Sequence, residues 1–148
     1  MENNLTWLLV ADASKARIFS MHKAKLFQED ANSHSIKLIH EFTHNKSRMK
    51  SADLVSDKLG EFNKNSYGVE HPKVHEAELF AQQLLTELDT GRKDRHYHEL
   101  ILIAPPAFMG ILNKHIPHEM EKLVSKTIEK DYTQESVENL IRKLVGFL

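Results

Sequence analysis

The sequence contains no cysteine, which excludes disulfide bonds, thiolate zinc sites and cysteine nucleophiles. No apolar run approaches the roughly 18 to 20 residues that a membrane-spanning helix needs. Neither sign of charge is in excess, since 20 Lys and Arg residues balance 21 Asp and Glu residues. Binding to nucleic acid must therefore depend on a local basic patch. Neither a Gly-x-Ser-x-Gly elbow nor a glycine-rich phosphate loop is present, so serine-hydrolase and P-loop chemistry have no support.

The N-terminus does not have the pattern of a secretory signal. Met1 to Asn4 are acidic in character and precede only about seven apolar residues. We therefore expect a cytoplasmic protein without a membrane span. The length of 148 residues predicts a single domain over residues 1–148 with a substantial core.

Two short apolar runs, residues 5–11 and 100–104, are typical of strands buried on both faces of a sheet. The long helical pattern between them predicts two parallel neighbours at the centre of that sheet. Residues 16–22 and 36–42 alternate with a period of two, so the first three strands are expected to form an antiparallel meander. In the third strand the pattern places four side chains on one face: Ile36, Leu38, His40 and Phe42.

The strongest helical pattern begins at Pro72, and we expect it to end at Gly91. Three further elements are predicted: a helix over 107–115, a short strand over 124–130 and a last helix over 137–148. The resulting order is a three-strand meander followed by helix, strand, helix, strand and helix. That order matches a ribonuclease-H-like mixed sheet of the α/β class.

Residues 43–71 are polar and show little periodicity, and so long a connection in a compact domain is usually functional or disordered. Cations near its start can follow a phosphate backbone, and an aromatic residue near its end can stack on a base. The predicted RNA-binding residues are Lys15, Arg17, Lys46, Arg48, Lys50 and Tyr67. The alternative is a solvated loop in which Arg48 pairs with Asp53 or Asp57.

Asp12 follows the first strand, where α/β proteins often place their chemistry. Together with Glu78, or alternatively Glu76, and with Asp131 it is a candidate for binding the metals of a phosphodiesterase, because two metal ions need several carboxylates. The set is incomplete, since Pro105 and Pro106 rather than an acid follow the strand at 100–104. The alternative is that Asp12 caps its own turn by accepting hydrogen bonds from the following backbone amides.

His71, His75 and Glu78 are spaced i, i+4 and i+7, which suits a zinc ion with one open position. The spacing is not that of the His-Glu-x-x-His metalloproteases. The alternative is a solvated helix face with His71 at the N-cap. We favour this alternative and expect no metal and no cofactor.

Five segments in order resemble the bacterial host attachment protein family. They are residues 7–19 (WLLVADASKARIF), 53–60 (DLVSDKLG), 75–81 (HEAELFA), 103–112 (IAPPAFMGIL) and 129–133 (EKDYT). Leu59 stands where that family usually has proline. The family in turn resembles the middle domain of archaeal and eukaryotic peptide-chain release factors. Those domains carry a Gly-Gly-Gln loop before the long helix, whereas residues 63–70 here contain Tyr67-Gly68-Val69.

The resemblance implies a non-enzymatic binding module that contacts RNA or the translation apparatus through residues 43–71, but not peptide release. A metal-dependent phosphodiesterase or nuclease using Asp12, Glu78 and Asp131 is the first alternative. The second is a protein-interaction factor that affects host-cell attachment indirectly. An exposed apolar patch around Phe108 and Met109 would favour the second alternative.

Overall fold

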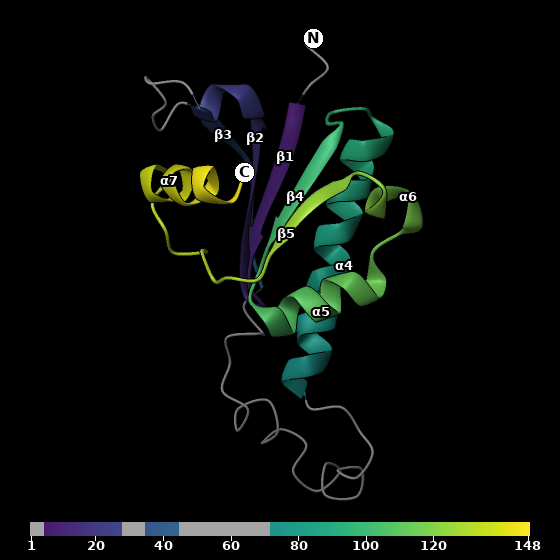
Figure 1. Ribbon diagram of the computed structural model, residues 1–148. Helices are drawn as coiled ribbons and strands as arrows, with labels where there is room; N and C mark the ends of the chain where they lie inside the picture. Colours follow the sequence, from purple (N-terminus) through teal and green to yellow (C-terminus); the bar gives the residue numbers. More distant parts are fainter. Residues whose placement is uncertain (1–4, 28–34, 45–71) are drawn as a thin grey trace, which may run out of the picture.

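A computed structural model describes residues 5–27, 35–44 and 72–148. Within these residues one mixed sheet has the strand order β3-β2-β1-β4-β5 (Figure 1). The strands are β1 (Leu5–Ala11), β2 (Lys15–His22), β3 (Ile36–Thr43), β4 (Glu99–Ile103) and β5 (Val124–Ile128). Strand β1 pairs antiparallel with β2 and parallel with β4. The predicted meander and the predicted parallel central pair are therefore both confirmed.

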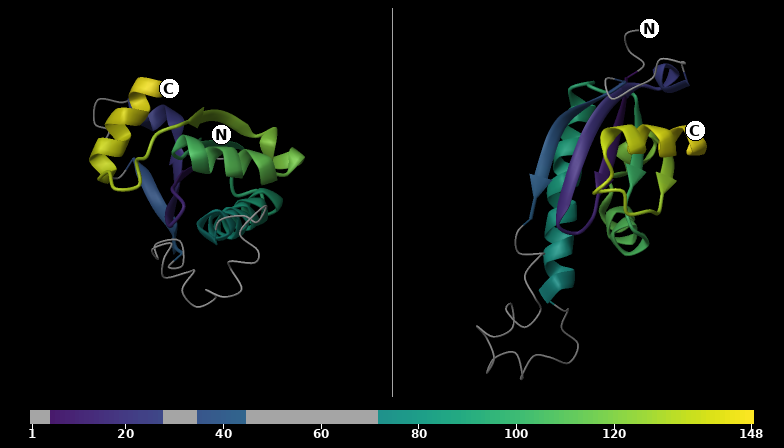
Figure 2. Two further views of the ribbon diagram at one scale, coloured as in Figure 1. Left: turned by 90° about the horizontal axis from the view of Figure 1, so that it is seen from below. Right: turned by 90° about the vertical axis from the view of Figure 1, so that its left-hand side faces the viewer.

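Helices cover both faces of the sheet (Figure 2). The helical elements of the described residues are a 3-10 helix η1 (Lys23–Phe27) and the α-helices α4 (Pro72–Lys93), α5 (Pro106–His115), α6 (His118–Glu121) and α7 (Val137–Phe147). Helices α4 and α5 contribute to the buried cluster on one face, and α7 and η1 contribute to the cluster on the other. This three-layer arrangement confirms the α/β class.

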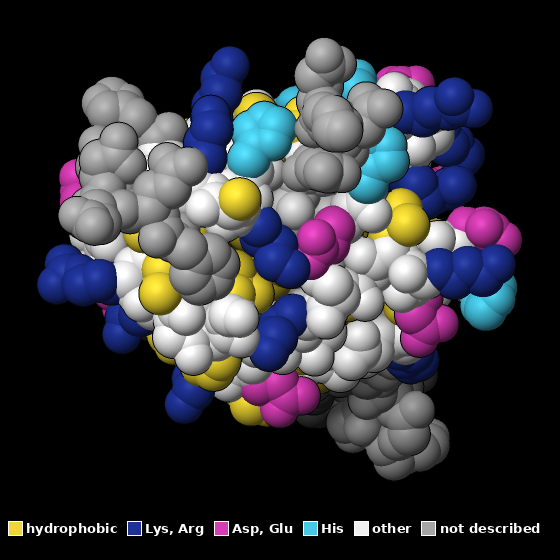
Figure 3. All heavy atoms as spheres, turned by 45° about the horizontal axis from the view of Figure 1, so that its top comes forward, with side chains coloured by type: hydrophobic (Ala, Val, Ile, Leu, Met, Phe, Trp, Pro, Cys, Tyr) yellow, Lys and Arg dark blue, Asp and Glu magenta, His cyan; other side chains and the backbone are white. Residues whose placement is uncertain are grey.

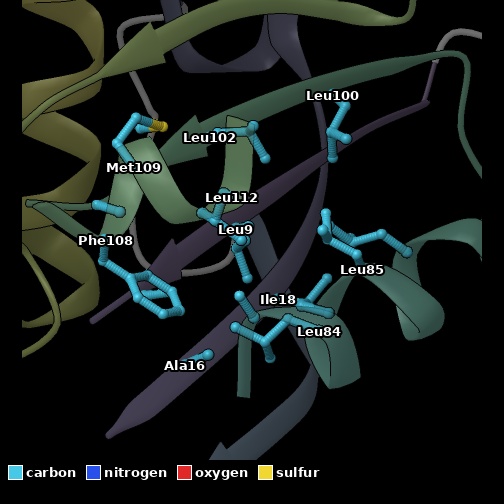
Figure 4. Packing of buried hydrophobic residues seen from close by; sticks show 14 of the residues in the cluster. Leu9, Ala16, Ile18, Leu84, Leu85, Leu100, Leu102, Phe108, Met109 and Leu112 are labelled. Carbon is cyan, nitrogen blue, oxygen red and sulfur yellow. The ribbon is translucent and has the colours of Figure 1, made fainter. Parts of the chain in front are cut away.

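The central strands are buried on both faces, as their apolar sequences predict. Leu9 and Leu102 pack with Leu84 of α4 and Leu112 of α5 in one cluster (Figure 4). Leu8 belongs to the cluster on the opposite face, which α7 completes. All side chains from Leu8 to Ala11 are fully buried. The alternating directions of side chains along a strand explain how one apolar run supplies both clusters.

The predicted faces of the third strand are wrong because β3 contains a bulge. Ile18 pairs with His40 while the next residue of β2 pairs with Leu38, so Ile39 has no partner in the register. A bulge reverses the alternation of side chains along a strand. Ile39 and Phe42 consequently pack on the α4 side of the sheet, whereas Ile36 packs on the α7 side.

The predicted end of the long helix at Gly91 is also wrong, since α4 continues to Lys93. The helix ends in a Schellman motif: the His96 N–H donates to the Gly91 carbonyl at 2.8 Å and the Arg95 N–H donates to the Arg92 carbonyl at 3.0 Å. The residue in the left-handed conformation is Arg95, with φ of 60°.

Phe108 and Met109, whose exposure would have favoured the second alternative, do not form an exposed apolar patch. Their side chains are 3% and 0% exposed, because α5 turns them into the cluster that it shares with α4. The observation that would have favoured a protein-interaction factor is therefore missing at these residues. Among the described helices, none has the length and apolar character required to cross a membrane.

Candidate functional site

The carboxylate of Asp12 caps the turn between β1 and β2. Its Oδ1 accepts hydrogen bonds from the backbone amides of Ser14 and Lys15, both at 2.8 Å, and from the Ser14 hydroxyl at 3.1 Å. The Asp12 N–H in turn donates to the Lys15 carbonyl at 2.9 Å. This is the turn-capping role that we considered, from the sequence, as the alternative to metal binding by Asp12.

The second oxygen of Asp12 faces Thr133, in the connection between β5 and α7. The Thr133 hydroxyl lies 3.1 Å from Asp12 Oδ2 and 2.8 Å from Asp131 Oδ1, so its one proton can serve either carboxylate. Thr133 is 6% exposed. The fold thus places Asp12 and Asp131 on either side of one hydroxyl group. The nuclease hypothesis requires its acids to lie close together, and these two of them do.

The third proposed acid, Glu78, is engaged elsewhere. Its Oε2 lies 3.2 Å from Lys114 Nζ and 3.6 Å from His115 Nε2, so it links α4 to the end of α5. The hydrogen bond from Lys114 is the main reason that the pKa of Glu78 lies below its ordinary value, and His115 adds to it. Among the described residues no group of three metal-ligating side chains is arranged to hold an ion.

Arg17 ties β2 to the connection that contains Thr133. Its Nη2 donates to the backbone carbonyls of Tyr132, Thr133 and Glu135 at 3.0 to 3.2 Å. Burial lowers the pKa of the guanidinium, and the nearby Glu41 and Glu135 partly offset this effect. These contacts occupy Arg17 inside the fold, which makes it a poor candidate for an RNA contact. Arg17, Lys15 and Thr133 also line one small cavity of about 160 Å³.

His44 joins the turn at Asp12 to the long helix. Its backbone N–H donates to the Ser14 carbonyl at 2.8 Å, and its Nε2 lies 2.8 Å from Glu76 Oε1. The imidazole also stacks on Phe80 with ring centroids 5.3 Å apart. The capped turn, the end of β3 and the first turns of α4 therefore form one connected unit.

The remaining predicted residues divide into two groups. His75 is exposed on α4. The other five lie outside the described residues: Lys46, Arg48, Lys50, Tyr67 and His71. The described part of the chain stops at His44, directly after β3, and resumes at Pro72, where α4 begins.

Sequence reasoning missed the role of Thr133 and the contact between His44 and Glu76. Thr133 meets an acid 121 positions away, and His44 meets Glu76 across 32 positions. Neither spacing has a local pattern that would reveal the contact. The only signal was weak and local: Thr133 follows Asp131 by two positions, a spacing that suits a capped turn.

Comparison with known proteins gives one family. No curated protein matches the chain. A family model described as "protein required for attachment to host cells" matches residues 7–144. Since this match spans nearly the whole sequence, the chain belongs to the family of proteins required for attachment to host cells.

Proposed function

We propose that this chain is a non-catalytic binding module and that residues 43–71 form its contact with RNA or the ribosome. The observation that carries the proposal is the 2.8 Å contact between His44 and Glu76. It joins residues on either side of positions 45–71, so the two described ends of this connection are held together. Polar connections anchored on a rigid scaffold are where proteins commonly place their binding residues.

The charge of the segment supports RNA as the partner. Lys46, Arg48 and Lys50 follow His44 within six positions, and Tyr67 lies near the other end. Cations neutralise phosphates and aromatic rings stack on bases. Lys15 adds a further cation close to the start of the segment. It follows Ser14, whose backbone carbonyl accepts a hydrogen bond from the His44 N–H.

The state of Asp12 supports binding rather than hydrolysis. A metal-binding carboxylate needs oxygen lone pairs directed at the ion. Here Oδ1 already accepts three hydrogen bonds within the turn and Oδ2 faces the Thr133 hydroxyl. A metal ion at Oδ1 would compete with the hydrogen bonds that cap the turn, and the Ser14 carbonyl of this turn accepts the His44 N–H.

We also infer a single ribonuclease-H-like domain related to the release-factor middle domain. The strand order β3-β2-β1-β4-β5, with an antiparallel meander and a parallel central pair, is the feature that supports this inference. In this proposal the role of the chain in host attachment is indirect and depends on its contact with RNA or the ribosome.

The test is co-sedimentation of the purified chain with ribosomes over a salt series. One variant removes the positive charge of the segment by combining Lys46→Ala, Arg48→Ala and Lys50→Ala. The matched control removes three exposed lysines from the C-terminal part of the chain: Lys122→Ala, Lys126→Ala and Lys130→Ala.

We expect wild type and control to co-sediment at low salt and to dissociate as salt rises. The segment variant should bind more weakly and with a shallower salt dependence, by about 0.7 to 0.9 in log–log slope for each phosphate that it no longer neutralises. Absence of co-sedimentation at any salt, or equal binding by all three proteins, contradicts the proposal. Complementing an attachment-deficient strain with the same variants tests whether attachment depends on this segment.

A further inference from the structure

A pocket is lined by residues from the start of β1, from the neighbouring strands β2 and β3, and from the connection that follows α4. Figure 1 shows that β1 begins and α4 ends at the same end of the molecule. The volume of the pocket is about 440 Å³, within the range of roughly 300 to 1,000 Å³ that is usual for sites binding small organic molecules. Leu5, Trp7 and Ile39 supply apolar surface, and His40, His96 and Arg95 supply polar groups. These residues come from β1, β3 and the connection between α4 and β4.

Three aromatic rings lie close to one another in the pocket. The Trp7 ring is 6.2 Å from the His40 ring at an interplanar angle of 71°, and 6.0 Å from the His96 ring at 42°. Trp7 is 5% exposed, whereas His40 and His96 are exposed. Figure 3 shows histidine side chains gathered at this end of the molecule. A flat ligand can therefore lie beside these rings and meet imidazole N–H donors.

The charge of the pocket favours an anion. Arg95 provides a permanent positive charge, and the described residues that line the pocket include no carboxylate. Glu99, the nearest acid along β4, is engaged by Lys23, with its Oε2 2.7 Å from the Lys23 ammonium. An arginine beside apolar surface is suited to bind a carboxylate through two parallel hydrogen bonds.

Arg95 is also the residue of this region whose backbone is strained. It has φ of 60° and occupies the position of the Schellman motif that glycine usually takes. A side chain at such a position costs conformational energy, and strain of this kind often marks a ligand site. Glycine at this position would relieve the strain but would leave the pocket without its arginine.

We propose that this pocket binds a planar aromatic carboxylate. Arg95 pairs with the carboxylate, His40 and His96 donate N–H groups or pack on the ring, and the apolar residues receive its edge. None of the described residues that line the pocket belongs to the segment 43–71, so this proposal does not depend on the proposed RNA contact.

The first test uses Trp7 as a reporter, because it is the one tryptophan of the chain and gives a single indole N–H signal in an NMR spectrum. The probe is 2-naphthoate, and its uncharged counterpart is 2-naphthalenemethanol. We expect 2-naphthoate to shift the Trp7 signal saturably. The alcohol should bind about tenfold more weakly, because it lacks the charge-assisted hydrogen bonds. Equal binding of both probes, or no saturable shift, overturns the proposal.

The second test separates binding from folding. Arg95→Gly removes the cation and relieves the backbone strain, so it should raise the Tm while weakening 2-naphthoate binding by about tenfold. A loss of affinity in a more stable protein cannot result from unfolding. The matched control, Arg142→Gln, removes an exposed arginine of α7 that hydrogen-bonds Asn139 and should leave the affinity unchanged. Unchanged affinity in Arg95→Gly overturns the proposal.

Discussion

The indole of Trp7 lies directly against the backbone of Gly91. A Cβ atom added to Gly91 would be 2.5 Å from both Cη2 and Cζ3 of the Trp7 ring, and 3.3 Å from Cε2 of Tyr97. Trp7 and Tyr97 pack together with ring centroids 4.8 Å apart, and the Tyr97 hydroxyl donates to the Leu88 carbonyl at 2.7 Å. The glycine therefore allows α4 to approach β1, and this close approach explains a glycine inside the helix.

Gly91→Ala should destabilise the fold by about 1 to 3 kcal/mol, because the ring must move away from the added methyl group. Gly110→Ala is the matched control, since no atom lies within 4 Å of its added Cβ. That change should stabilise the fold by about 0.5 to 1 kcal/mol through helix propensity. Urea unfolding of both variants measures the difference, and equal effects would contradict the close packing of Trp7.

Arg95→Gly should raise the free energy of unfolding by about 0.5 to 1 kcal/mol, because glycine adopts a positive φ without the strain that a side chain introduces. Arg95→Ala is the control: it removes the guanidinium but keeps a Cβ, so it should give no such gain. Thermal unfolding distinguishes the two variants. A stabilisation as large in the alanine variant would mean that the side chain, not the backbone, is the source of the strain.

Asp12→Ala should destabilise the fold by about 1 to 3 kcal/mol, because the amides of Ser14 and Lys15 lose their acceptor. Asp12→Asn keeps a carbonyl oxygen at the same place and should cost less. Chemical unfolding gives both values. The nuclease hypothesis makes a different prediction, that Mg²⁺- or Mn²⁺-dependent cleavage of RNA or DNA exists and disappears in Asp12→Asn.

The contact between His44 and Glu76 should give a coupling energy of about 0.5 to 1 kcal/mol in a double-mutant cycle with alanine at each position. Both side chains are largely shielded, with 19% and 14% exposed. A cycle that pairs His44 with Glu87, farther along α4, serves as the control and should be additive. Additivity in the first cycle as well would remove the observation on which the proposed binding segment depends.

Glu99 should make stability depend on pH in the acid range. Burial by itself would raise the pKa of Glu99, but hydrogen bonds from Lys23, Ser125 and Thr6 outweigh it, so the pKa is lowered. A lowered folded-state pKa means that Glu99 stabilises the fold above the ordinary carboxyl pKa. This contribution is lost as the pH falls through the folded value.

Glu99→Gln should therefore be less stable than wild type at neutral pH, with a difference that shrinks in acid. Unfolding midpoints in urea over a pH series measure this change. Glu129→Gln, which alters an exposed acid beyond β5, is the control and should track wild type at every pH. A constant difference between Glu99→Gln and wild type would contradict the assigned role of its ionised form.

Most secondary structure followed from local patterns. The runs at 5–11 and 100–104 became the central parallel strands, and the helical periodicity after Pro72 became α4. Two details did not follow, the faces of β3 and the end of α4. The bulge at Ile39 depends on pairing with β2, and Gly91 reflects contact with Trp7 rather than a helix stop. Neither partner is visible in the local sequence.

The sequence by itself determined the α/β class, because apolar runs and helical periodicity report which surfaces a segment must bury. Only the tertiary structure decided what the polar side chains do. It directed Arg17 to the carbonyls near Thr133, and it joined His44 to Glu76. Such contacts link positions far apart in the chain, and their geometry depends on how whole strands and helices pack. Local helix and strand propensities therefore do not predict these contacts.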